Sequence, residues 1–211
     1  MTLSLILILS TVTIIPTSKS QVTRVYESTD VPRNIYDLET IESIIYVQDK
    51  GTIEDINVKI WIYHSFDRNL DVYLISPSGT EITLFTDVGG NENNFVNTTL
   101  DDEASISITS GFAPFNGAYR PEENLSKLDG EEMQGTWILR IYDDTTTNEG
   151  YLSAWSIEIT YPSPPIWAQW WFWALVLGVI AVVAIVIIIV VKRRKPVSPA
   201  IPIPPPPPPP S

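Results

Sequence analysis

The stretch LDVYLISPSGTEITLF, residues 70–85, decides the expected fold of this chain. Apolar residues alternate with polar ones on both sides of Ser76-Pro77-Ser78-Gly79, and Ser, Pro and Gly are typical turn residues. An alternation with a period of two places every second side chain on one face of a strand. The stretch therefore predicts a β-hairpin with one strand before the turn and one after it.

The same pattern extends over residues 40–160 and predicts more strands. Further alternating runs occupy residues 53–62, 105–108, 137–142 and 152–159. Turn signals recur at Gly89-Gly90, Asn116-Gly117, Asp129-Gly130 and Asn148-Glu149-Gly150. Seven to nine short strands predict an all-β domain, an antiparallel β-sandwich or jelly roll. We expect Trp137 and Trp155, which lie on these strands, to pack in its core.

Charge and cysteine content limit what this domain can do. The chain has no cysteine, which excludes disulfides and thiolate metal sites. Its net charge is −12, and the eight basic and 25 acidic residues between the N-terminal leader and Lys192 give that region −17. Such a surface repels nucleic acid. It suits an exported domain, a cation-binding surface or a high-salt habitat.

The N-terminus has the features of a signal peptide. Residues 3–15 are apolar apart from Ser and Thr, a run too short to span a bilayer comfortably. Ser18 and Ser20 have the spacing of a signal-peptidase site, so we expect residues 1–20 to be removed before Gln21. A buried N-terminal strand and an uncleaved anchor are the alternatives.

A second apolar segment predicts a transmembrane helix at 170–191. It contains 22 residues without charge or proline, enough for a helix of about 33 Å against a hydrocarbon core of about 30 Å. Four tryptophans crowd its start, and the basic residues 192–195 follow its end, which marks that end as cytoplasmic. We therefore expect a single-pass protein of the cell membrane with its N-terminal domain, residues 21–161, outside the cytoplasm.

Proline-rich segments flank this helix. Residues 162–169 form the expected stalk between domain and membrane, because proline cannot continue a strand ladder. The tail, residues 192–211, ends in seven consecutive prolines before Ser211, which favour polyproline II. This tail is either a docking peptide for a polyproline-binding partner or an unstructured end.

Several stretches of residues 46–161 resemble the P-domain (P/Homo B) that follows the catalytic domain in kexin- and furin-like subtilisin-type proprotein convertases. The similar pieces are the hairpin at 70–80, Gly89-Gly90 with Asn94-Phe95, Leu100-Asp101-Asp102-Glu103-Ala104, residues 114–122, Gly135-Thr136-Trp137-Ile138-Leu139, and Gly150-Tyr151-Leu152 with Trp155. This resemblance implies a β-sandwich that supports a serine protease and is itself non-catalytic.

The sequence gives little support for a catalytic function. The single histidine, His64, falls on an expected strand, and no G-x-S-x-G elbow surrounds Ser76 or Ser78. A glycosidase needs two carboxylates facing each other across a groove, which the sequence does not define. We therefore expect no enzymatic activity from this chain.

Acidic loop residues are the candidate metal ligands. Asp101, Asp102, Asp143 and Asp144 offer the oxygen atoms that Ca²⁺ prefers, whereas capping of turns is the alternative role. Asn97 and Asn124 begin N-x-[ST] sequences and are candidate glycosylation sites. No other cofactor is expected.

Three functions follow from these observations. The first is a membrane-anchored P-domain that binds or stabilises a partner protein, such as a subtilisin-like protease. The second is a calcium-dependent jelly-roll module that binds carbohydrate or another ligand. The third is the separated accessory part of a split serine endopeptidase.

Overall fold

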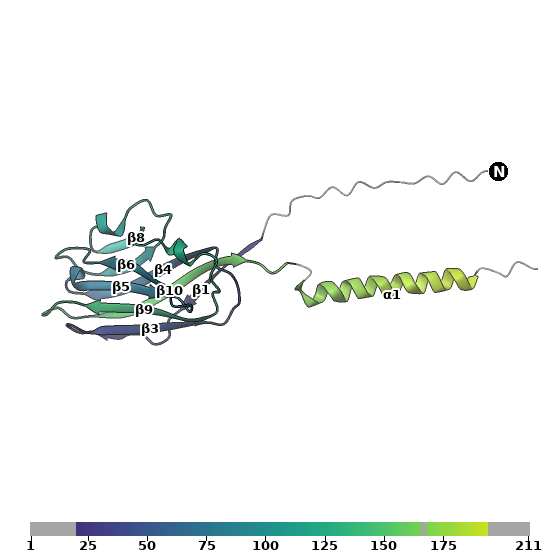
Figure 1. Cartoon of the computed structure of the whole chain (residues 1–211), viewed down its shortest axis with the longest axis horizontal. Helices are drawn as coiled ribbons and strands as arrows, with labels where there is room; N and C mark the ends of the chain where they lie inside the picture. The colour runs from purple at the N-terminus through teal and green to yellow at the C-terminus, as the bar shows by residue number, and fades with distance from the viewer. Residues whose placement is uncertain (1–19, 166–167, 194–211) are drawn as a thin grey trace, which may run out of the picture. The chain divides into compact units, whose positions relative to one another are not determined.

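The structure is a computed structural model and describes residues 20–165 and 168–193. The chain divides into two compact units, with the boundary between Ser163 and Pro164 (Figure 1). The first unit is a sandwich of two β-sheets, and the second contains one long helix. The expected all-β domain with one long C-terminal helix is thereby confirmed.

The larger sheet has six strands. They are β1 (Gln21–Glu27), β2 (Arg33–Ile35), β4 (Asp55–His64), β7 (Phe95–Leu100), β8 (Phe115–Tyr119) and β10 (Gly150–Pro162). The strand order is β1-β10-β4-β7-β8, with the short β2 also paired to β10. All pairs are antiparallel except β7 with β8, which run parallel.

The smaller sheet has four antiparallel strands in the order β3-β9-β5-β6. They are β3 (Thr40–Val47), β5 (Leu70–Ile75), β6 (Glu81–Thr86) and β9 (Gly135–Asp143). The predicted hairpin is β5-β6, whose turn is closed by a bond from the Gly79 amide to the Ser76 carbonyl (2.9 Å). Three short 3-10 helices lie between strands: η1 (Asp67–Asn69), η2 (Ile108–Ser110) and η3 (Leu125–Leu128).

The core lies between the two sheets because each strand turns its apolar residues inward. In β4 every second side chain is buried, namely Ile56, Val58, Ile60 and Ile62. Trp137 and Trp155 are buried as predicted, and their indole N–H groups donate to the Met133 carbonyl (3.0 Å) and the Ser43 hydroxyl (2.7 Å). Bonded in this way, the two indoles add large apolar area without leaving a donor unpaired.

A stack of phenylalanines ties the sheets together. Phe85 of β6 stacks on Phe95 of β7 with ring centroids 4.5 Å apart, and Phe95 stacks on Phe115 of β8 at 4.8 Å. Because Phe85 belongs to the smaller sheet and the other two to the larger, this stack joins the β6 edge of the smaller sheet to the β7-β8 edge of the larger one.

Four local expectations differ from the structure. The strand expected at 105–108 is a bridge at Ser107 followed by η2, and Asn116-Gly117 lies inside β8 instead of forming a turn. Pro162, expected in the stalk, is the last residue of β10 and pairs with Gln21 of β1. The pairing of β10 with β4 has already ended at Thr160, so β4 needs no donor from this proline. Strands β1 and β2 were not predicted because charged and hydroxyl residues interrupt their alternation.

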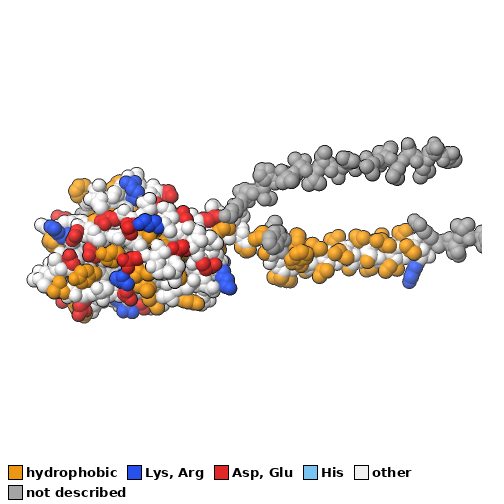
Figure 2. All heavy atoms as spheres, in the orientation of Figure 1, with side chains coloured by type: hydrophobic (Ala, Val, Ile, Leu, Met, Phe, Trp, Pro, Cys, Tyr) orange, Lys and Arg blue, Asp and Glu red, His pale blue; other side chains and the backbone are white. Residues whose placement is uncertain are grey.

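Helix α1 (Trp170–Arg193) has 24 residues, none of them buried, and is long and apolar enough to cross a membrane. The visible side of α1 carries hydrophobic side chains along its length (Figure 2). Lys192 and Arg193 occupy its last turn, so the described helix continues two residues beyond the predicted span. The expected signal peptide up to Lys19 and the tail beyond Arg193 lie outside the described residues.

Candidate functional site

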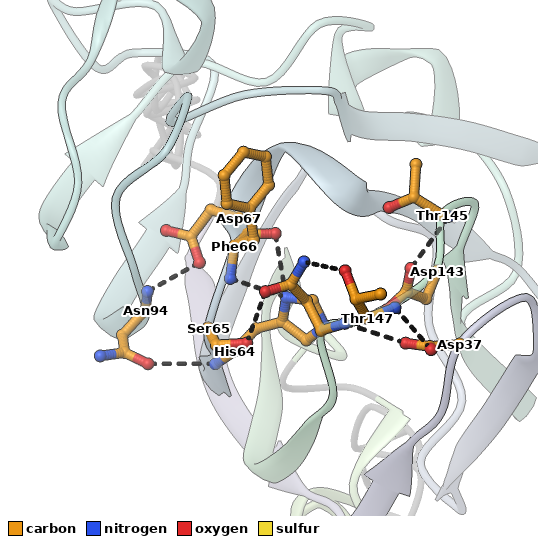
Figure 3. Close-up of polar contacts among 10 residues, drawn as sticks. Asp37, His64, Ser65, Phe66, Asp67, Asn94, Asp143, Thr145 and Thr147 are labelled. Atoms are coloured by element: carbon orange, nitrogen blue, oxygen red, sulfur yellow. Dashed lines mark hydrogen bonds and ion pairs between the residues drawn. The ribbon is translucent and has the colours of Figure 1, made fainter.

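The chain's single histidine lies in a buried polar cluster at the end of β4 (Figure 3). His64 Nε2 is 2.9 Å from Oδ2 of Asp143, the last residue of β9, and both side chains are fully buried. His64 Nδ1 lies 3.0 Å from the carbonyl oxygen of Phe66. Burial raises the pKa of the Asp143 carboxyl.

Backbone groups hold the rest of the cluster in place. The Thr145 amide donates to Asp143 Oδ1 (3.1 Å), and the Thr147 and Asn148 amides donate to Asp37 (2.6 and 3.1 Å). The cluster thus joins the ends of β4 and β9 to the loop that leads into β10, as Figure 3 shows.

Asp67 extends this cluster toward β7. Its Oδ1 accepts the Asn94 amide at 2.7 Å, and the Asn94 side chain in turn accepts the His64 amide at 3.0 Å. Asp67 Oδ2 is buried without a hydrogen-bond partner among the described residues. Burial raises the pKa of Asp67 to about 7.

In this arrangement the His64 ring is held inside the domain. Both ring nitrogens of His64 are engaged in the interior, so the imidazole cannot reach a substrate. The hydroxyls of Ser76 and Ser78 instead bond to Glu131 Oε2, at 2.8 and 2.5 Å. They tie the hairpin turn to the chain after η3.

The acidic residues singled out in the sequence form two pairs on different sheets. Asp101 and Asp102 follow β7 of the larger sheet, whereas Asp143 ends β9 of the smaller sheet and Asp144 follows it. Asp102 accepts the amides of Leu125 and Ser126, both at 2.9 Å, and so caps η3. Within residues 20–165 and 168–193, no three His, Asp or Glu side chains are grouped as a metal site. Calcium binding at these residues stays a prediction.

Both glycosylation candidates lie on the surface. Asn97 is exposed on β7 and Asn124 is exposed directly before η3. Attachment of a glycan at either residue stays a prediction.

A groove crosses the outer face of the larger sheet, and sequence reasoning missed it. Strand β4 contributes Asn57, Lys59 and Trp61, whose side chains alternate with its buried isoleucines and valine. Strand β10 contributes Ser156 and Glu158. Val25 and Glu27 of β1 line one side, and Thr99 with Asp101 line the other; these nine residues define the outer groove, of about 400 Å³.

Strand pairing explains why these residues meet. Glu158 stands between Val25 and Asn57 in register, and Ser156 stands between Glu27 and Lys59. The alternation of β4 predicts which of its side chains face outward. Only the strand order, however, places β1 beside β10, so that Val25 and Glu158, about 130 residues apart in the sequence, lie next to each other.

The fold is a two-sheet β-sandwich whose buried polar cluster is built around the His64–Asp143 pair. The chain belongs to the proprotein convertase P-domain family, whose family model matches residues 53–159. The matched segment runs from the residues before β4 almost to the end of β10 and confirms the resemblance seen in the sequence.

Two solved structures from Aeromonas sobria are similar to this chain. One is a complex of a serine protease with its chaperone, with 18% identity over 69% of this chain and a TM-score of 0.45. The other is a serine protease, with 20% identity over 67% of this chain and a TM-score of 0.43. The match covers 27% of the length of each of those chains. No curated protein matches the chain.

Proposed function

We propose that this chain is a membrane-anchored P-domain that binds and stabilises a partner protein on the outer side of the cell membrane. Its membership in the proprotein convertase P-domain family carries the proposal. A P-domain in this family accompanies a protease, and here it is followed by α1. The partner we propose is a subtilisin-like serine protease encoded separately.

The length and composition of α1 support membrane anchoring. A helix of 24 residues extends over about 36 Å, enough to span the hydrocarbon core. Lys192 and Arg193 in its last turn favour a cytoplasmic C-terminus, which supports an outer position for the P-domain.

In this proposal the chain stabilises its partner and does not itself catalyse a reaction. His64 is fully buried against Asp143 and is the sole histidine of the sequence. A serine nucleophile would therefore lack a histidine base.

Cross-linking at the surface of cells that produce the chain tests this proposal. An affinity-tagged full chain is cross-linked with a membrane-impermeant reagent and purified, and its partners are identified by mass spectrometry. We expect a subtilisin-like protease to be enriched over the level recovered with a tagged control in which residues 168–211 are fused to an unrelated β-sandwich. Equal recovery with both baits would contradict the proposal.

The genomic position of the partner distinguishes two versions of this function. A protease encoded next to this chain and lacking a P-domain of its own would make the pair a split endopeptidase. A protease with its own P-domain would make this chain a separate stabilising factor.

A further inference from the structure

An exposed phenylalanine stands beside a groove at the edge of the sandwich that β6 and β8 form. Phe112, in the loop between η2 and β8, is 86% exposed, more than any other large hydrophobic residue described in the β-sandwich. The groove has a volume of about 490 Å³ and is lined by residues 86–90, Thr109, Gly111 and Phe112, which we call the Phe112 groove. A large apolar side chain exposed beside a groove is typical of a protein-interaction surface.

The loops that form this groove lie directly on the core. A Cβ atom added at Gly111 would lie 2.7 Å from the ring of the buried Phe115, and one added at Gly89 would lie 2.9 Å from the same ring. The Gly111 amide donates to the carbonyl of Ile108 (3.1 Å), which is also buried. The backbone that carries Phe112 is therefore fixed between two core residues. A contact residue fixed in this way loses less conformational freedom when a partner binds.

Carboxylates without ionic partners border the groove. Asp87 lines the groove, and Thr86 beside it pairs in register with Asp71 of β5. The Thr86 amide and hydroxyl donate to the two carboxylate oxygens of Glu122, both at 3.1 Å. Burial and the negative charges nearby, first that of Asp87, raise the pKa of Asp71 to about 6. None of Asp71, Asp87 and Glu122 forms an ion pair with a described residue, so the chain itself leaves this border negative.

We propose that the Phe112 groove is the surface by which the chain binds its partner protein. In this interface the Phe112 ring enters an apolar pocket of the partner, and lysine or arginine side chains of the partner face Asp87 and Glu122. The inference rests on the proposed function and names the surface that the partner occupies. An apolar anchor surrounded by a charged rim is the usual anatomy of a protein interface, and opposite charges at the rim steer the partner into register.

A membrane surface and a second copy of the chain fit this groove less well. Insertion of Phe112 among lipid headgroups would bring Asp87 and Glu122 toward the bilayer, where a desolvated charge is costly. In a pair of identical chains the same patch contributes from both sides, so these carboxylates would meet their own like charges. A basic surface on a different protein avoids both costs.

Photo-cross-linking on cells that produce the full chain tests this surface. The photoreactive amino acid p-benzoyl-phenylalanine is introduced at Phe112 or, as a matched control, at Tyr46. Tyr46 is an exposed aromatic residue of β3, the strand at the opposite edge of the smaller sheet from β6. We expect irradiation to link the subtilisin-like protease to the chain from Phe112 and not from Tyr46. Mass spectrometry of the linked peptides should place the link beside apolar protease residues with lysine or arginine near them.

Affinity measurements separate the apolar anchor from the charged rim. Microscale thermophoresis is performed with the full chain in lipid nanodiscs and the purified protease. Phe112→Ser should raise the Kd about tenfold or more through loss of the anchor. Asp87→Asn, which suits the positive φ at this position, should raise the Kd about twofold to fivefold and make binding less sensitive to salt. Tyr46→Ser should leave the Kd unchanged, and thermal unfolding verifies that each variant is folded.

Failure of this surface can be told from failure of the proposed function. Links to the protease from Tyr46 as strong as those from Phe112, links from Phe112 to lipid or to a second copy of the chain, or an unchanged Kd in Phe112→Ser would overturn the groove alone. The same holds if neither position links the protease while the membrane-impermeant reagent still recovers it. Recovery of no protease by either method would overturn both proposals.

Discussion

Asp67 is a buried carboxyl group whose ionisation affects the stability of this fold. The carboxyl is buried, its Oδ2 lacks a partner among the described residues, and burial raises its pKa to about 7 from an ordinary 3.8. The folded state therefore holds its proton more tightly than the unfolded state does. The stability from this protonation is complete below about pH 4 and is lost as the pH rises toward 7.

Asp67→Asn removes this pH dependence. A difference of about three pKa units corresponds to about 4 kcal/mol between pH 4 and pH 7, so the variant should gain that much relative to the wild type over this range. Urea unfolding of both proteins at several pH values measures the difference. Parallel pH profiles for the variant and the wild type would show that Asp67 is ionised in the folded state.

His64 leads to a prediction about reactivity. The imidazole is held between Asp143 and Phe66, and no serine hydroxyl of the described residues hydrogen-bonds to it. A fluorophosphonate probe, which labels activated serines, should leave the folded chain unlabelled over hours, while a subtilisin control is labelled in minutes. Stoichiometric labelling of the chain that heat denaturation abolishes would contradict the absence of a catalytic serine.

Residue roles were only partly predictable from the sequence. The burial of Trp137 and Trp155 followed from their places on alternating strands. The pairing of His64 with Asp143 did not, because the two residues are 79 positions apart and meet through the strand order. A local sequence pattern does not show which strands are neighbours in a sheet.

At the scale of elements, the junction of β4 and β10 leaves no room for a side chain at Gly150. A Cβ atom there would collide with the Tyr63 carbonyl oxygen and lie 2.5 Å from His64 Cδ2. Gly150→Ala should therefore destabilise the domain by about 1–3 kcal/mol, as overpacking of tight sites does. Thermal or urea unfolding measures this, with Thr146→Ala in the preceding loop as the control. A loss below about 0.5 kcal/mol would mean that the two strands separate easily.

Most of the strands that could be predicted have an unbroken alternation. Strands β4, β5 and β9 bury every second residue without a break. Strands β6 and β10 were also predicted, although Phe85 in β6 and a register shift between Leu152 and Ala154 in β10 interrupt their alternation. Strands β1 and β2 were not predicted from the sequence. Both are held mainly by backbone pairing with β10, and such pairing does not require an alternation of apolar residues. The parallel pairing of β7 with β8 depends on the long loop between them, and no turn motif signals it.

Helix α1 makes the orientation of the chain testable. The sequence contains no cysteine, so a single introduced cysteine reports its own side of the membrane. In intact cells a membrane-impermeant maleimide should label Ser126→Cys in η3 and should label Ser198→Cys in the tail only after permeabilisation. Labelling of both positions, or of the tail alone, in intact cells would contradict the proposed orientation.

At the scale of the whole molecule, the chain combines a P-domain with a helix that is long and apolar enough to cross a membrane. The buried core of the sandwich is formed by residues between Ile35 and Tyr161, with Val22, Tyr26 and Val31 packed against it. Its acidic surface, with basic side chains interspersed on the side shown in Figure 2, remains open to a partner. These features favour a tethered module that acts on a separate protein.

The most direct test of this account is the thermal inactivation of the protease that cross-links to the chain. The purified protease is heated alone, with the full chain in nanodiscs, and with empty nanodiscs, and its remaining activity is followed over time. We predict that the full chain lengthens the half-life of the protease severalfold and that this effect saturates at one chain per protease, as expected when a ligand binds the folded state. An identical half-life in all three samples would contradict the stabilising role proposed for this P-domain.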